Sequence, residues 1–255
     1  MTKPPSSMSA AALVELRQYT LKPGARGDLV ELFERELIEP QEAAGMRVGG
    51  VFLDRDDAER FVWFRGFTDM AARRQALQGF YHGPTWARFR SAANDTMLDS
   101  DDVLLLRPTS PAHPLRGPAA PRSAHPGSPP SDEWVTVSVY GHDPDPELAR
   151  WLATDVHAEL EERLQVPVAT YRSEPAENDY PALPVRADNV FVWSAVFADE
   201  AACRYARQRL ERSATWRNDI SPALERRLST RQHLRLQPTA RSQHPAASPH
   251  EARPS

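Results

Sequence analysis

The residues of this sequence that are best suited to chemistry lie on one alternating segment near its start. Glu15, Arg17 and Tyr19 are two positions apart, and because the side chains of a β-strand alternate between the faces of its sheet, all three project from one face. Arg17, or Arg65 two strands away, could bind an anionic or enolate oxygen while Tyr19 donates a hydrogen bond or a proton to it. The alternative is a structural network in which these polar groups only satisfy one another.

A second group of candidates lies at a predicted break between two helical segments. Tyr81 and His82 are placed there, where side chains can overhang a pocket between a sheet and its helices. His82 is the best general acid or base because its unperturbed pKa is close to neutrality; the alternative is an exposed histidine that caps a helix. The sequence thus predicts catalytic roles for His82, Tyr19, Arg17 and Arg65, and substrate-binding roles for Glu15, Trp63, Tyr81 and Trp86.

The elements that must position these side chains follow the order βαββαβ in the first half of the chain. A Pro23 and Gly24 turn opens the first helix, Gly45 ends it, and Asp69 caps the second helix, which breaks before Pro84. The predicted elements are strand 13–21, helix 26–44, strands 46–53 and 60–67, a helix after Asp69, a helical stretch over 84–98, and strand 103–106.

The second half repeats the first at a fixed offset of 130 positions. Phe61, Val62 and Trp63 recur as Phe191, Val192 and Trp193, and residues 61–108 align with 191–238 without a gap. Trp86 likewise recurs as Trp216, so Trp63 and Trp86 are more economically read as core residues than as a substrate platform. We still expect one of them to line the pocket. The second half is predicted to contain strand 135–140, helix 147–164, strands 168–173 and 190–197, a broken helix over 200–228, and strand 233–236.

This order is the split βαβ plan of ferredoxin-like folds. Each four-stranded sheet would leave one face without helices, and two such sheets bury that face by packing together. The predicted fold class is therefore α+β, with tandem ferredoxin-like domains that pack sheet to sheet as a dimeric α+β barrel. The predicted divisions are a disordered N-terminus (1–12), a first domain (13–108), a proline-rich linker (109–132), a second domain (133–238) and a disordered tail (239–255).

Comparison of the two halves indicates where a site would lie. With Tyr19 aligned to Tyr140, the second half has Thr136 and Ser138 in place of Glu15 and Arg17, Ala195 in place of Arg65, and Arg212 in place of His82. The first half keeps the ionisable set and the second half lacks it. We therefore expect the active site within residues 13–108.

Composition narrows the classes of partner. The chain has 31 basic and 35 acidic residues and a net charge of -4, which argues against binding to nucleic acid. No stretch reaches the roughly 18 apolar residues of a membrane span, and no export signal is visible. The single cysteine, Cys203, excludes an internal disulfide and indicates a reducing compartment, so we expect a cytoplasmic protein. The excess of arginine over lysine is typical of a GC-rich bacterial genome.

Neither a metal nor a cofactor is expected. His142, Asp155 and His157 could be metal ligands, but Asp155 and His157 would point in different directions on a helix. The sequence contains no Gly-rich phosphate loop, no G-x-S-x-G elbow and no H-E-x-x-H motif. No histidine is placed as a proximal haem ligand, although a haem-binding relative is a third alternative that a Soret band would reveal.

Three segments resemble the NIPSNAP family of the dimeric α+β barrel superfamily. They are ELRQYTLKPG (15–24), VWFRGF (62–67) and FYHGPTWARF (80–89), and the resemblance covers residues 13–108 and, more loosely, 133–238. It implies a superfamily that includes cofactor-independent quinone and anthrone monooxygenases, haem-degrading oxygenases, polyketide cyclases and proteins without known activity. The fold alone does not select among these chemistries.

The function that these expectations favour is a small enzyme of bacterial secondary metabolism. We expect it to act on an aromatic or polyketide-like substrate as a cofactor-independent oxygenase or cyclase. Such chemistry requires a dry pocket, an apolar wall and one group that removes or donates a proton. The alternative is a non-catalytic small-molecule-binding or scaffolding protein. A small-molecule substrate is the expected partner, and a homodimer is compatible with the architecture.

Overall fold

The structure is a computed structural model that describes residues 11–109, 122, 125–126 and 128–243. Residues 1–10 of the N-terminus predicted to be disordered (1–12), most of the predicted linker and the last part of the predicted tail lie outside the described residues. Residues 11 and 12 are described: Ala11 is buried, and the Ala12 amide donates to Phe67 O at 3.0 Å.

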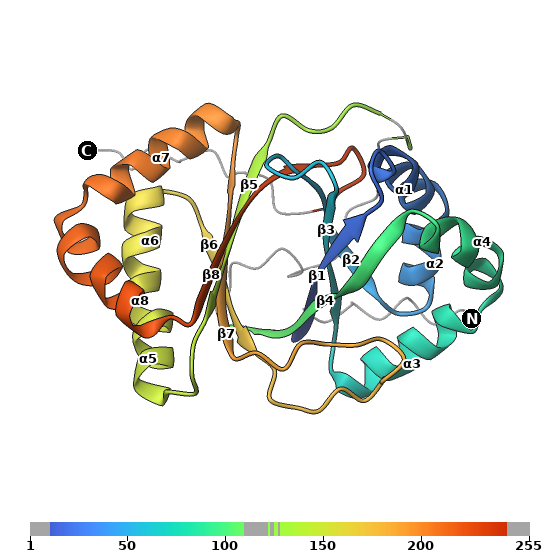
Figure 1. The fold of residues 1–255 in the computed structure, drawn as a ribbon, viewed down its shortest axis with the longest axis horizontal. Coiled ribbons are helices and arrows are strands. Elements are labelled where there is room, and N and C mark those ends of the chain that lie inside the picture. The colour runs from blue at the N-terminus through green and yellow to red at the C-terminus, as the bar shows by residue number, and fades with distance from the viewer. Residues whose placement is uncertain (1–10, 110–121, 123–124, 127, 244–255) are drawn as a thin grey trace, which may run out of the picture.

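Eight antiparallel strands form a single closed barrel between two sets of helices (Figure 1). Around the barrel the strands follow the order β1-β3-β2-β8-β5-β7-β6-β4. Strands β1 to β4 belong to the first half and β5 to β8 to the second. The strands are β1 (Leu13–Leu21), β2 (Arg47–Asp54), β3 (Arg60–Phe67), β4 (Met97–Pro108), β5 (Trp134–Gly141), β6 (Val168–Ser173), β7 (Val190–Phe197) and β8 (Thr230–Pro238).

The edges of the two sheets also pair, so that one chain closes the barrel. Strand β2 pairs with β8, where Leu53 is opposite Gln237, and β4 pairs with β6, where Arg107 is opposite Arg172. Closure leaves none of these strand edges without a partner sheet. The predicted face-to-face packing of two sheets is therefore realised as one barrel.

The two halves share one pairing register. The cross-strand pairs of the first half have counterparts in the second: Glu15 with Arg65 and Thr136 with Ala195; Arg17 with Trp63 and Ser138 with Trp193; Arg17 with Val103 and Ser138 with His233. The alignment of Tyr19 with Tyr140 is thus reproduced by backbone hydrogen bonding. Equivalent residues can be compared directly between the halves.

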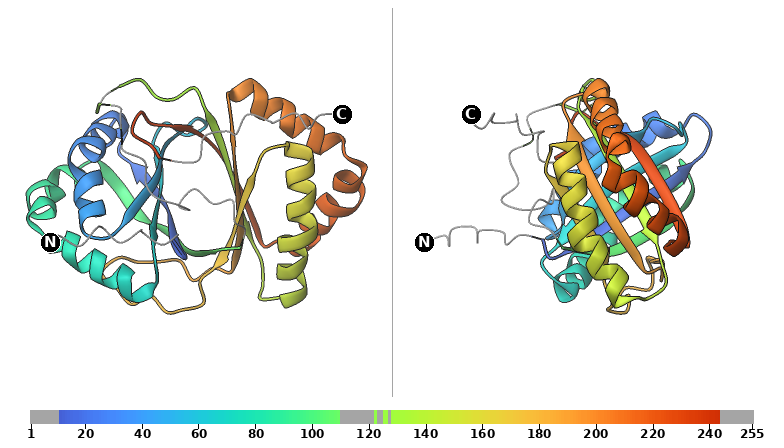
Figure 2. Two further views of the ribbon diagram at one scale, coloured as in Figure 1. Left: turned by 180° about the vertical axis from the view of Figure 1, so that it is seen from behind. Right: turned by 90° about the vertical axis from the view of Figure 1, so that its left-hand side faces the viewer.

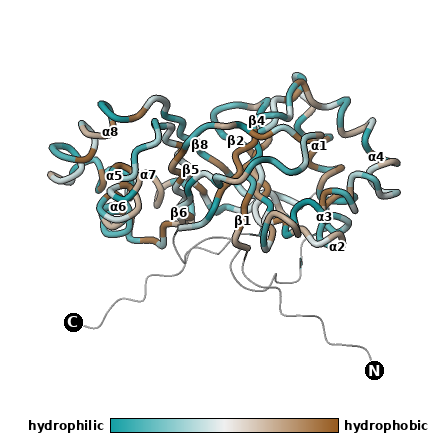
Figure 3. Tube along the Cα trace, turned by 90° about the horizontal axis from the view of Figure 1, so that it is seen from below, coloured by the Kyte–Doolittle hydropathy of each residue, from teal (hydrophilic) through white to brown (hydrophobic). Residues whose placement is uncertain are grey.

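Alternation along each strand divides the side chains into an inner and an outer set. Inner residues from both halves, such as Leu16, Phe64, Val137 and Tyr171, fill the barrel as one apolar cluster. Brown, hydrophobic stretches of the chain run through strands such as β1 and β2 in Figure 3. The outer sets pack separately against the helices of their own half. The polar residues of β1 that could do chemistry therefore lie outside the barrel, beneath helices.

Helices cover the outer face of each half, on opposite sides of the barrel (Figure 2). In the first half they are α1 (Arg26–Leu32), η1 (Phe33–Leu37), α2 (Ile38–Ala43), α3 (Met70–Tyr81) and α4 (Pro84–Asn94). In the second half they are α5 (Pro146–Trp151), η2 (Leu152–Val156), α6 (His157–Leu164), α7 (Glu200–Arg212), η3 (Trp216–Ile220) and α8 (Ser221–Arg227). Within the described part of the chain, none of them combines the length and apolar character needed to cross a membrane.

Most predicted boundaries agree with the structure, and two differ. Gly45 ends α2 with a φ of 99°, as the sequence suggests. The helix predicted over 84–98 instead ends at Asn94, and β4 begins at Met97, well before the predicted residue 103. The reason is that β1 offers backbone partners as far as Leu21, which is opposite Met97.

The chain also stays ordered beyond the predicted start of its tail at residue 239. The Thr239 amide donates to Val51 O at 2.9 Å, and the Gln243 amide donates to Gly49 O at 2.7 Å. Residues 239–243 thus continue beside β2, because β8 pairs with only the last residues of that strand.

Two connections between strands differ greatly in length. Residues 174–189, named the strap here, join β6 to β7 and cross to the helices of the first half, where they run beside α3 (Figures 1 and 2). The Glu174 amide donates to Leu105 O at 2.9 Å, and the Arg186 amide donates to Val103 O at 2.8 Å. The equivalent connection of the first half, residues 55–59, is a short turn. The strap therefore covers the first half, whereas the equivalent connection, residues 55–59, is too short to cover the second half in the same way.

Candidate functional site

Glu15 is the centre of a buried ionic cluster in the first half. Its two carboxylate oxygens accept hydrogen bonds from Arg17 Nη1 at 2.8 Å, Arg65 Nε at 2.6 Å and Arg73 Nε at 2.6 Å. All four side chains are at most 2% exposed. Burial alone would raise the pKa of Glu15, but Arg65, Arg17 and Arg73 outweigh it and hold the pKa well below its usual value. Glu15 is therefore an anion that three arginines hold in place.

Tyrosines and the strap complete this cluster. Arg17 Nε donates to Tyr19 Oη at 2.9 Å, and Arg65 Nη1 donates to Tyr81 Oη at 3.3 Å. Arg73 Nη1 donates to Asp179 Oδ1 of the strap at 3.0 Å. The sequence-predicted residues Glu15, Arg17, Tyr19, Arg65 and Tyr81 are therefore close together. Their polar groups bond to one another, which is the structural network that the sequence offered as the alternative.

The other predicted residues of the first half lie around this cluster. Trp63 is 1% exposed and packs against Phe33, with ring centroids 4.8 Å apart. Trp86 is half-buried, with its ring 5.1 Å from that of Tyr81. His82 follows α3, where its amide donates to Gln78 O at 3.1 Å, and its side chain is exposed. The proposed acid or base therefore lies on the surface, and its catalytic role stays a prediction.

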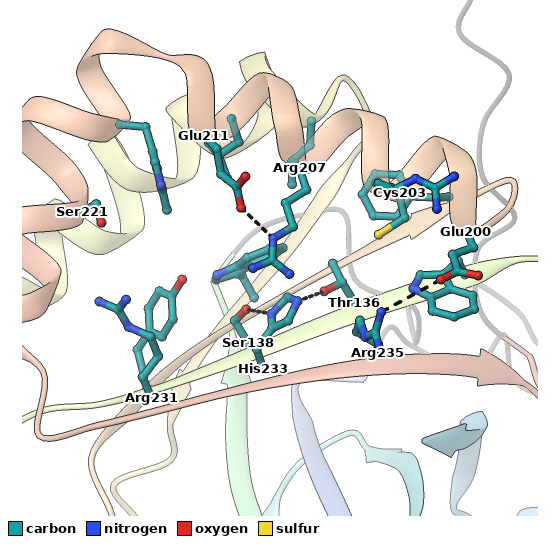
Figure 4. A pocket seen from close by; sticks show the side chains of 18 residues that line it. Thr136, Ser138, Glu200, Cys203, Arg207, Glu211, Ser221, Arg231, His233 and Arg235 are labelled. Atoms are coloured by element: carbon teal, nitrogen blue, oxygen red, sulfur yellow. Dashed lines mark hydrogen bonds and ion pairs between the residues drawn. The ribbon is translucent and has the colours of Figure 1, made fainter. Parts of the chain in front are cut away.

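The second half contains a cavity of about 460 Å³ at the equivalent place. It lies between the outer face of β5, β7 and β8 and the helices α7, η3 and α8 (Figure 4). Its volume falls within the roughly 300–1,000 Å³ of ligand pockets. Its wall is partly aromatic, with contributions from Trp134, Tyr140, Trp193, Phe197 and Trp216.

Small side chains account for this cavity. Thr136, Ser138, Ala195 and Cys203 stand where the first half has Glu15, Arg17, Arg65 and Arg73. The ionic cluster fills the space between sheet and helices in the first half, and the smaller residues leave that space open in the second. The short 55–59 turn does not cover it as the strap covers the first half.

His233 of β8 lines the cavity between two hydroxyl groups, and its side chain is also exposed to solvent. Its Nδ1 is 2.8 Å from Ser138 Oγ, and its Nε2 is 3.2 Å from Thr136 Oγ1. Thr136 can itself donate to Leu234 O at 3.5 Å, which favours a tautomer in which Nε2 donates to Thr136 and Nδ1 accepts from Ser138. Burial, Arg207 and Arg235 lower the pKa of His233 to about 4. The imidazole is therefore neutral at pH 7.

Arginines give the cavity a cationic rim. Arg207 reaches from α7 toward the strands and pairs with Glu211 at 2.8 Å (Figure 4). Arg235 pairs with Asp56 of the first half. The guanidinium of Arg231 lies 5.8 Å from the centre of the Tyr140 ring. Such a rim favours ligands that carry or develop negative charge.

Cys203 also lines this cavity. Burial raises the pKa of its thiol to about 11. The thiol therefore stays protonated at neutral pH and lacks the thiolate form that a nucleophile needs.

Most of the first half of the chain matches the model of a known protein family. The NIPSNAP family model matches residues 14–112. This segment is a NIPSNAP domain. The resemblance predicted from the three sequence segments is thereby confirmed, and the cavity with His233 lies outside the matched residues. A search of proteins with curated functions gave no match.

Solved structures resemble the whole chain, of which the NIPSNAP domain is one half. A candidate monooxygenase from Fusobacterium nucleatum subsp. nucleatum ATCC 25586 has a TM-score of 0.58 at 10% identity, over 91% of this chain and 94% of that one. An anthrone oxidase-like protein has a TM-score of 0.56 at 14% identity, over 98% and 99% of the two chains. A candidate monooxygenase from Lactobacillus acidophilus NCFM has a TM-score of 0.54 at 12% identity, over 90% and 97%. Likeness at this level of identity establishes the barrel fold alone.

Differences between the NIPSNAP domain and the second half could have revealed the cavity from sequence. The ionisable residues of the first half that the second half lacks were considered, but the ionisable residues present only in the second half were not. At the offset of 130, His233 stands where the NIPSNAP domain has Val103, and Arg207 stands where it has Leu77. Polar residues in place of apolar ones on outer strand and helix faces were the signal that could have revealed this site.

Metal ligands do not gather in the described ranges. No group of three or more His, Cys, Asp or Glu side chains there could hold a metal ion. His157, one of the residues weighed from sequence, instead lies 3.5 Å from Glu161 on α6.

Proposed function

We propose that this chain is a cofactor-independent oxygenase or cyclase of bacterial secondary metabolism, and that an aromatic or polyketide-like substrate enters the second-half cavity. The observation that carries the proposal is a partly aromatic cavity of about 460 Å³ with a neutral histidine on its floor. The likeness in fold to proteins named as candidate monooxygenases and as anthrone oxidase-like supports this reaction class. We place the protein in the cytoplasm. In this proposal, the barrel arose by duplication of a ferredoxin-like unit.

The proton transfer in this mechanism runs through Ser138. The Ser138 hydroxyl donates to His233 Nδ1 and can accept a hydrogen bond from a phenol or enol of the substrate. The substrate proton would pass to Ser138 as the Ser138 proton passes to His233. Arg207 and Arg235 stabilise the resulting oxyanion, because the positive potential that disfavours a charged His233 favours a negative substrate.

The redox step needs molecular oxygen and no other co-reactant. For an anthrone, the deprotonated ring transfers electrons to O₂, and its methylene carbon forms a bond to one oxygen atom. Loss of water, which carries the second oxygen atom, leaves the quinone carbonyl. The carbon is oxidised and O₂ is reduced, so that CH₂ and O₂ become C=O and H₂O.

Oxygen uptake with 1,8-dihydroxyanthrone tests the proposal. His233→Gln removes the proton acceptor and should lower the rate about 100-fold or more. The matched control is His157→Gln, a partly exposed histidine on α6 outside the cavity, which should leave the rate unchanged. A full rate in His233→Gln together with a lost rate in His82→Gln would overturn the proposal and favour the site predicted in the first half from His82, Tyr19, Arg17 and Arg65.

A binding protein without turnover is the second candidate, and one observation favours it. A histidine with a pKa of about 4 is a weak base at neutral pH. Saturable binding of 1,8-dihydroxyanthrone with no oxygen uptake, and with affinity reduced in Arg231→Ala, would establish this role.

A further inference from the structure

The strap inserts a carboxylate and an aromatic ring, in that order, into the first half. Asp179 Oδ1 lies 3.0 Å from Arg73 Nη1. The next residue, Tyr180, is 8% exposed, and its ring centre lies 6.4 Å from that of Tyr81 at an interplanar angle of 30°. This part of the strap thus has the chemical form of an aromatic carboxylate.

The arginines beneath the strap are not balanced by the carboxylates that they contact. Arg17, Arg65 and Arg73 are at most 2% exposed, and they pair with Glu15 and Asp179, so three cations meet two anions. The buried Nη2 atoms of Arg65 and Arg73 have no hydrogen-bond partner in the described part of the molecule. Buried cationic donors without partners are costly. The cluster is therefore suited to accept a further oxyanion.

We propose that the first half carries a second ligand site, specific for a small aromatic carboxylate, which Asp179 and Tyr180 of the strap fill in this structure. The ligand's carboxylate would bind Arg73, and its ring would take the place of the Tyr180 ring beside Tyr81. This site is independent of the function proposed for the second-half cavity.

Arg73 explains how a ligand can displace the strap. Asn178 Oδ1 and Asp179 Oδ1 of the strap both accept from Nη1 of Arg73, at 3.0 Å each, and Nη2 has no partner in the described part of the chain. A free carboxylate can bind both nitrogens, and such forked pairs are stronger than single contacts. Asp179 is 25% exposed, and backbone hydrogen bonds of Glu174 and Arg186 hold the flanks of the strap to β4. The middle of the strap can therefore yield while its flanks stay attached.

Calorimetric titration of the full chain with 4-bromobenzoate tests this site. Asp179→Asn removes the competing carboxylate and should tighten binding about tenfold. Asp188→Asn is the matched control, because Asp188 is a strap carboxylate that pairs with exposed Arg186 away from the cluster, and it should bind as the unmodified chain does. The neutral analogue 4-bromobenzamide should not bind. Equal affinity in Asp179→Asn and the unmodified chain would overturn the proposal.

The position of the bromine atom separates this site from the second-half cavity. Crystals of Asp179→Asn soaked in 4-bromobenzoate should show anomalous bromine density beside Tyr81, with the carboxylate on Arg73. Bromine density confined to the cavity near His233 would overturn the proposal. If Asp179→Asn does not fold, Tyr180→Ala frees the ring position and should also bind more tightly than the unmodified chain; weaker or equal binding there would count against the site.

Discussion

Partial desolvation in the cavity, together with Arg207 and Arg235, lowers the pKa of His233, and this makes the stability of the protein depend on pH. The pKa is about 6.5 in the unfolded chain and about 4 in the folded one, so between these values the unfolded chain binds more protons. The free energy of unfolding should therefore fall as the pH drops from 6.5 to 4, by well under about 3 kcal/mol because His233 is exposed and solvent screens its charge. This residue should contribute nothing above pH 6.5.

Urea unfolding at a series of pH values measures this dependence. The carboxylates of the protein titrate in the same range, so the relevant quantity is the difference between the unmodified chain and His233→Gln. That difference should change by most of the expected amount between pH 6.5 and 4. Parallel pH profiles of the two proteins would contradict the lowered pKa of His233 in the folded chain.

Glu15 should matter more to stability than any exposed carboxylate. Glu15→Gln leaves Arg17, Arg65 and Arg73 buried without their shared anion, and loss of one partner from a buried ion pair costs about 3–5 kcal/mol. Glu31→Gln, which breaks an exposed pair with Arg35, should cost less than about 1 kcal/mol. Denaturant unfolding of both variants at pH 7 tests this, and similar losses would show that the cluster is not a structural anchor.

The sequence predicted that polar residues of β1 would lie together on one face of the sheet. It did not predict which side chains of other elements would bind them. Strand alternation places Glu15, Arg17 and Tyr19 on one face, and the structure agrees. Arg73 and Asp179 could not be placed in the same way, because a helix and a loop must first be packed against that face. The burial that decides between a network and a site is likewise a property of the packed structure.

The helices α3 and α7 begin with equivalent N-caps, and this repetition permits a paired test. Asp69 accepts from the Ala72 amide at 2.8 Å, and Asp199 accepts from the Ala202 amide at 2.7 Å. Replacement of either aspartate by alanine should cost about 1 kcal/mol of unfolding free energy, and the double variant about the sum, because the sites are far apart. Asp219→Ala, at an exposed position within η3, should change stability by less than about 0.5 kcal/mol. Thermal unfolding of these four variants and of the unmodified chain gives the comparison.

Elements with a strong local pattern were predictable, and those defined by distant partners were not. Strand β3 and the Asp69 cap of α3 follow from local sequence and occur as predicted. The early start of β4 depends on the length of β1, and the course of the strap depends on residues of the other half. A loop without hydrophobic periodicity gives no local indication of the surface on which it packs.

The barrel interior belongs to both halves at once. Its apolar cluster joins residues of β1 and β3, such as Leu16 and Phe64, to residues of β5 and β6, such as Val137 and Tyr171. An engineered protease site within residues 110–121 should therefore yield two fragments that elute together from a size-exclusion column, since separation would expose the apolar interior. Each half expressed alone should aggregate or self-associate. Fragments that separate and stay monomeric would contradict a shared core.

The strap also limits which recombinants of related genes can fold correctly. Asp179 is encoded 106 positions after Arg73, the residue with which it pairs. A recombination event that exchanged only the leading half between related genes would separate the covering segment from the surface it evolved to fit. Viable natural chimaeras should therefore bring compatible straps with them, and the two halves should be inherited as one block.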